Sequence, residues 1–67
     1  MQYRKNEKYA RVVTGQGTVR VEIFTKYGWE LDAHAETIVV DGKEYITIIM
    51  IHHIMSLVSQ GYEIEYV

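Results

Sequence analysis

Three histidines are the side chains in this chain best suited to acid–base or metal chemistry. His34 lies between Asp32 and Glu36 in the sequence, two residues from each. In an extended strand these alternate residues share a face, so they could form a general acid–base pair or a metal site. Alternate strand residues lie nearly 7 Å apart (about two rises of 3.3 Å), however, which is typical of a solvated polar row. We therefore expect no metal and no catalytic pair there.

The adjacent pair His52-His53 also resembles a metal motif. If this segment is helical, neighbouring side chains point about 100° apart, whereas helical zinc ligands converge at a spacing of four residues. Residues 46–60 contain no acidic side chain that could complete a site, and the chain has no Cys to supply a thiolate. We expect no metal or other cofactor.

Candidate nucleophiles have little support from their neighbours. Ser56 and Ser59 fall inside the same predicted helix, with no base and no oxyanion donor in a suitable position. The segment Gly15-Gln16-Gly17 contains a GxG, but it joins two predicted strands, lacks a third glycine and opens no helix. The sequence therefore predicts a protein that is not an enzyme.

The charges are divided unevenly along the chain. Residues 1–26 carry a net charge of +4 and residues 27–67 one of −6. This split is expected if the two ends pair as neighbouring strands. It also leaves open a basic, aromatic segment for a nucleotide, a small ligand or a nucleic acid, and an acidic face that imitates a phosphate backbone. The basic candidates are Tyr3, Arg4, Lys5, Lys8, Tyr9 and Arg11, and the acidic ones are Glu30, Asp32 and Glu36.

Alternating apolar residues predict strands over residues 8–13, 18–26 and 29–40 and at the C-terminus, over 62–66. Glycine-containing turns separate the first three, and Asp41-Gly42 is the strongest turn signal. A break near Glu36-Thr37 would let Ile38 and Val40 face the core. We expect one α+β domain over residues 1–67, a small antiparallel sheet of four to five strands with one helix packed on it, in the order β-β-β-(β)-α-β.

The segment after Asp41-Gly42 fits two structures. Residues 43–51 are rich in β-branched side chains and could form a return strand. Alternatively, Thr47 caps a helix that runs to about Gln60 and ends at Gly61. A helical projection of residues 47–60 separates apolar from polar side chains almost completely, with only Ile49 out of place. This pattern favours the helix, preceded by a short return strand.

The apolar arc of the predicted helix spans about 200°, roughly twice what packing on one sheet requires. Small single-chain proteins seldom expose so much contiguous apolar surface. We therefore expect self-association or docking on another protein, unless the sheet curls around the helix and covers it. The predicted interface residues are Ile48, Ile49, His52 and Met55.

Composition sets the broad class. The 67 residues are 48% hydrophobic and 24% charged, as in a folded protein, and no apolar run is long enough to cross a membrane. Met1 to Lys8 lacks the apolar stretch of a signal peptide, so the expected location is the cytoplasm. In size and make-up the chain resembles small accessory proteins of phages and mobile elements. That resemblance implies a protein that binds and blocks another protein. Together with the apolar arc of the helix, it leads us to expect a homodimeric module that binds and inhibits or modulates another macromolecule.

Overall fold

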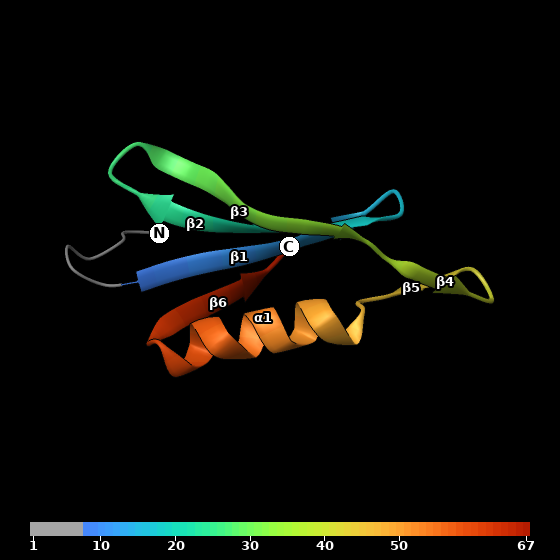
Figure 1. The fold of residues 1–67 in the computed structure, drawn as a ribbon. Helices are drawn as coiled ribbons and strands as arrows, with labels where there is room; N and C mark the ends of the chain where they lie inside the picture. The colour runs from blue at the N-terminus through green and yellow to red at the C-terminus, as the bar shows by residue number, and fades with distance from the viewer. Residues whose placement is uncertain (1–7) are drawn as a thin grey trace.

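In the computed structural model, which describes residues 8–67, three long strands form an antiparallel meander (Figure 1). They are β1 (Lys8–Gly15), β2 (Thr18–Thr25) and β3 (Gly28–Glu36). Two-residue loops join them, so successive strands lie side by side with little chain spent on the connections. Together with one helix, these strands confirm the predicted α+β class.

A second, two-stranded ribbon follows β3 and projects from the end of the main sheet (Figure 1). It consists of β4 (Ile38–Val40) and β5 (Lys43–Tyr45). Between them, Asp41 and Gly42 both have positive φ, 52° and 78°, which a type I′ hairpin turn requires. The turn and the short return strand predicted from the sequence are confirmed.

The base of this ribbon is attached to the β1–β2 turn. One Glu44 carboxylate oxygen accepts a hydrogen bond from the Gly17 N–H at 2.6 Å and another from the Thr37 hydroxyl at 2.9 Å. The expectation that Ile38 and Val40 would enter the core is wrong, because their side chains are 52% and 50% exposed. The chain does break at Thr37, but the ribbon beyond it extends past the helix rather than over it (Figure 1).

The helix α1 (Ile48–Ser59) begins and ends where the sequence predicts. The Thr47 side chain caps its first turn by accepting a hydrogen bond from the Met50 N–H at 3.4 Å. At the other end Gly61 has a φ of 94°, a conformation that a residue without Cβ adopts at low cost, and its N–H bonds to the Val58 carbonyl. This tight end turns the chain straight into the last strand.

The last strand, β6 (Tyr62–Tyr66), lies beside β1, so the order of the main sheet is β3-β2-β1-β6. The predicted neighbour is correct, but β6 pairs with β1 in the parallel direction, whereas β1–β2 and β2–β3 are antiparallel pairs. The strands β3 and β6 therefore run in the same direction. The reason is that α1 carries the chain back along the sheet before β6 begins. The β3–α1–β6 segment is thus a crossover between parallel strands.

The core lies between α1 and one face of the sheet. Its buried members are small residues of β1 and β2 and larger residues of the helix, namely Ala10, Val12, Val19, Val21, Met50, Ile54 and Leu57. On the helix these follow at intervals of four and three residues, the spacing of one face. Only one face of α1 is therefore buried against the sheet.

A bulge in β3 changes which of its residues face the helix. Val21 pairs with Ala33 but Glu22 pairs with Leu31, which leaves Asp32 as the extra residue. Ala33 consequently faces the core, whereas Leu31 lies on the opposite face and is 56% exposed. An unbroken alternation would have placed Trp29 and Leu31 on the helix face of β3, together with Ala33 and Ala35.

The cap at Thr47 yields a direct test of the helix. Thr47→Ala should lower the free energy of unfolding by about 1 kcal/mol, because the first-turn N–H group loses its side-chain acceptor. Thr47→Ser keeps the hydroxyl and should recover most of that loss. Chemical denaturation followed by circular dichroism measures both variants. Equal losses in the two would show that the hydroxyl does not stabilise the helix.

Candidate protein-interaction surface

The side of α1 that does not pack on the sheet is apolar along its whole length. Ile48, Ile51, Met55 and Val58 make up this stripe, and they are 67%, 42%, 61% and 55% exposed. Their intervals of three, four and three residues keep them within an arc of about 80° on a helical projection. The same intervals occur in the seam of a coiled coil, where such residues meet another helix. We call these four residues the helix stripe.

The helix stripe lies on the flank of α1 that faces the β6 edge of the sheet. The opposite flank is marked by His53, whose Nε2 lies 2.5 Å from Asp32 Oδ2 on β3, at the other edge. Alternation along β6 places Tyr66 on the same face as Tyr62 and Ile64, which pack against the core. Tyr66 is 68% exposed. It therefore extends the apolar surface from the helix stripe onto the sheet.

The four predicted interface residues do not share one surface. Ile48 and Met55 belong to the helix stripe. Ile49 is 81% exposed but points toward β3, and His52 lies on the polar outer side of the helix. Two stripe members, Ile51 and Val58, were not singled out from the sequence. The signal for them was the repeated three-four spacing beginning at Ile48, which continues through both.

On its β3 flank, α1 borders a cavity of about 290 Å³. The residues around it come from β3 and from the first half of the helix, and they are Ala33, His34, Ala35, Thr47, Ile49, Met50 and His53. Because Ala33 and Ala35 have short side chains, the edge of the sheet does not fill the space beneath the helix. The cavity is therefore a groove between a helix and an edge strand.

The histidines do not gather into a chemical site. Asp32 turns toward His53 on the helix, while His34 stands opposite Arg20 in the β2–β3 pairing. Within residues 8–67, no three side chains of the His, Cys, Asp and Glu types are arranged to hold a metal ion. The bulge thus separates Asp32 from His34 and Glu36, which still share one face of the sheet.

The predicted acidic face is divided in the same way. The Glu30 carboxylate accepts a hydrogen bond from the Thr25 hydroxyl, and Asp32 contacts His53. Glu36 lies at the far end of β3, opposite Thr18. The bulge between Glu30 and Glu36 places them on different faces of the sheet. They form an acidic edge along β3 rather than one continuous acidic face.

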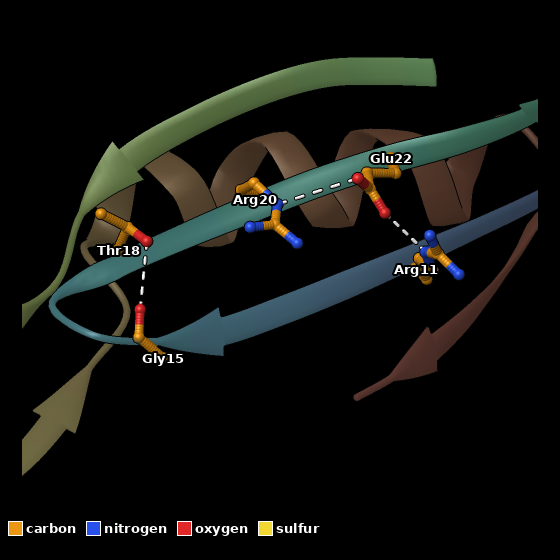
Figure 2. A network of polar contacts seen from close by, with 5 residues as sticks. All are labelled: Arg11, Gly15, Thr18, Arg20 and Glu22. Carbon is orange, nitrogen blue, oxygen red and sulfur yellow. Dashed lines mark hydrogen bonds and ion pairs between the residues drawn. The ribbon is translucent and has the colours of Figure 1, made fainter. Parts of the chain in front are cut away.

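The basic candidates that the structure describes have partners within the chain. Arg11 lies on the sheet face opposite the helix, where its Nε donates to Glu22 at 2.5 Å (Figure 2). Its guanidinium also lies 4.3 Å from the centre of the Trp29 ring. The Lys8 ammonium donates to the Gln60 carbonyl and lies over the Tyr62 ring. Tyr9 pairs with Glu63 of β6. Tyr3, Arg4 and Lys5 fall outside the described residues.

These contacts explain part of the charge split. The basic strand β1 does lie beside the acidic strand β6, with Arg11 opposite Glu65 in the register. The ion pair of Arg11, however, is made with Glu22 on its other side, where Arg20 also approaches the same carboxylate at 3.7 Å (Figure 2). The cations of β1 thus tie strands together instead of forming an open basic patch.

Comparison with protein families, curated proteins and solved structures found no match for this chain. Among the described residues, α1 is the only helix, and it is too short to cross a membrane. The candidate site therefore rests on the geometry alone.

The Arg11 cluster predicts a measurable stability difference. Arg11→Met should lower the free energy of unfolding by about 1 kcal/mol, because Glu22 loses a charge-assisted hydrogen bond and Trp29 loses a cation–π contact. It should also shift the fluorescence of Trp29, the single tryptophan of the chain.

Arg20→Met is the matched control, since Arg20 is 49% exposed and its Nε is 3.7 Å from the same carboxylate. Arg20→Met should lower the free energy of unfolding by less than about 0.5 kcal/mol. If both variants lose the same amount in urea denaturation, the close contacts of Arg11 add nothing to stability.

Proposed function

We propose that this protein is a non-enzymatic interaction module that forms a homodimer through the helix stripe and acts by binding another macromolecule in the cytoplasm. Binding by so small a chain would inhibit or modulate the partner by occupying part of its surface. The observation that carries the proposal is the helix stripe, Ile48, Ile51, Met55 and Val58, each of them 42% to 67% exposed.

The balance of apolar surface supports association. Among the described residues, seven hydrophobic side chains are buried, whereas fourteen large hydrophobic side chains are exposed. Scattered exposed residues are ordinary, but the helix stripe is contiguous and runs for about 15 Å along α1, at a rise of 1.5 Å per residue. A surface of this kind is typical of a protein interface.

A second copy of the chain fits the helix stripe well. A two-fold interface requires a surface that complements itself, and branched and flexible apolar residues at intervals of three and four pack against the same pattern on an antiparallel copy. The helix contains no Lys, Arg, Asp or Glu, so no like charges oppose each other across the pair. Antiparallel helices also bring opposite ends of their dipoles together.

The dimer needs more than the helices alone. A stable interface buries about 800 Å² on each partner. Tyr66, which is 68% exposed, continues the apolar surface from α1 onto the end of β6. We propose that it takes part in the interface. This arrangement leaves the groove on the β3 flank and the β4–β5 ribbon open to a different partner.

The alternatives that rest on basic residues gain less support. A nucleotide or nucleic acid needs cations with free donors, whereas Lys8 and Arg11 already bond within the chain. The cavity beside β3 is lined mainly by apolar side chains and is smaller than most ligand sites, which span roughly 300–1,000 Å³. It suits a single side chain better than a nucleotide.

Removing the apolar character of the helix stripe tests the dimer. The unmodified protein should sediment as a dimer at micromolar concentrations, with a melting temperature that rises with protein concentration. Ile48→Lys and Met55→Lys should each weaken dimerisation at least tenfold, because a buried lysine at the seam leaves its charge without a partner.

Ser56→Lys adds the same charge next to Met55 but on the polar side of the helix, so it should remain a dimer. Circular dichroism distinguishes dissociation from unfolding, since a lysine at an exposed position should leave the helix content unchanged. A monomeric unmodified protein at 100 μM would contradict the proposal.

A further inference from the structure

The strand β3 is an open edge of the main sheet. It pairs with β2 on one side and with no other described strand on its other side (Figure 1). Alternate N–H and C=O groups along that side therefore point outward, where another strand can bond to them. Such an edge is a template for an extended peptide.

The bulge divides the open edge of β3 into two halves. Asp32 is the extra residue in the pairing with β2, and its carboxylate contacts His53. A bulge interrupts the regular spacing of backbone groups, so a partner strand cannot continue evenly past it. One regular part of the edge is residues 28–31, and the other is residues 33–36.

The half made of residues 33–36 lies against the cavity. Ala33, His34 and Ala35 form the strand wall, and Ile49, Met50 and His53 form the helix wall. In a strand added to residues 33–36, alternate side chains would point to the helix side of the sheet, into this space. A volume of about 290 Å³ accommodates one large apolar side chain.

The charges along β3 favour a basic partner over an acidic one. The strand β3 carries Glu30, Asp32 and Glu36 and no Lys or Arg, and α1 has no Lys or Arg either. Carboxylates along an edge repel an acidic strand and attract a basic one. A strand from a second copy of β3 would itself be acidic, which disfavours self-pairing at this edge.

We propose that the groove between β3 and α1 binds an extended, basic segment of a partner protein by strand addition to residues 33–36. One apolar side chain of the segment fills the cavity beside Ile49, and flanking Lys or Arg side chains meet the carboxylates of β3. This inference rests on the proposed role as an interaction module and specifies the chemistry of the partner.

Two adjacent isoleucines separate this site from the dimer surface. Ile48 belongs to the helix stripe and Ile49 lines the groove, because consecutive helical residues point about 100° apart. Both are more than 60% exposed, so a lysine at either position leaves the core intact. Each therefore serves as the control for the other.

The test uses fluorescein-labelled eight-residue peptides with a central Phe flanked by Lys, measured by fluorescence anisotropy with the full-length protein. The Lys peptide should bind saturably. Replacing its lysines by Glu should weaken binding at least tenfold, and so should methylation of alternate backbone nitrogens, which removes the donors that a strand needs. Ile49→Lys should abolish binding, whereas Ile48→Lys should bind as the unmodified protein does while losing the dimer.

Three results would overturn the groove assignment: no saturable binding up to 1 mM, equal affinity of the methylated peptide, or unchanged binding by Ile49→Lys. Sedimentation of the same samples separates the two proposals. If the protein is a dimer that does not bind the peptide, only the groove proposal is wrong. If the unmodified protein is a monomer that binds the peptide, only the dimer proposal is wrong.

Discussion

The packing of Met50, Ile54 and Leu57 against Ala10 and the valines of β1 and β2 is the contact on which the rest of the structure depends. It holds α1 on the sheet, and among residues 8–67 this is the only helix that covers it. Because the sheet side of this contact is made of small residues, the helix uses only a narrow face for it. The remaining circumference of α1 is left to solvent or to partners.

The position of α1 also creates two unlike surfaces on its two flanks. Toward β6, the helix stripe is apolar, exposed and without charge. Toward β3, the short side chains of Ala33 and Ala35 leave a groove with carboxylates along its edge. One helix therefore separates the helix stripe from the groove, and we propose that the first binds a copy of the chain and the second a basic strand.

The opposite face of the sheet has a different role. There Arg11, Glu22 and Trp29 bond and stack across three neighbouring strands. Arg11 and Glu22 neutralise each other's charge, and Arg11 stacks on the half-buried Trp29 ring. These contacts stabilise a face that no helix of residues 8–67 covers, and they engage the guanidinium of Arg11 within the chain.

The sequence by itself determined the strands, the Asp41-Gly42 turn, the Thr47 cap and the limits of α1, because these depend on short-range periodicity and on residues with special backbone preferences. It also indicated that α1 has more apolar surface than one sheet covers. Only the tertiary structure decided the parallel direction of β6, the bulge at Asp32 and the separation of Ile48 from Ile49 into different surfaces. These features depend on which side of the helix meets the sheet and on the volume available beneath it, and residues distant in sequence set both.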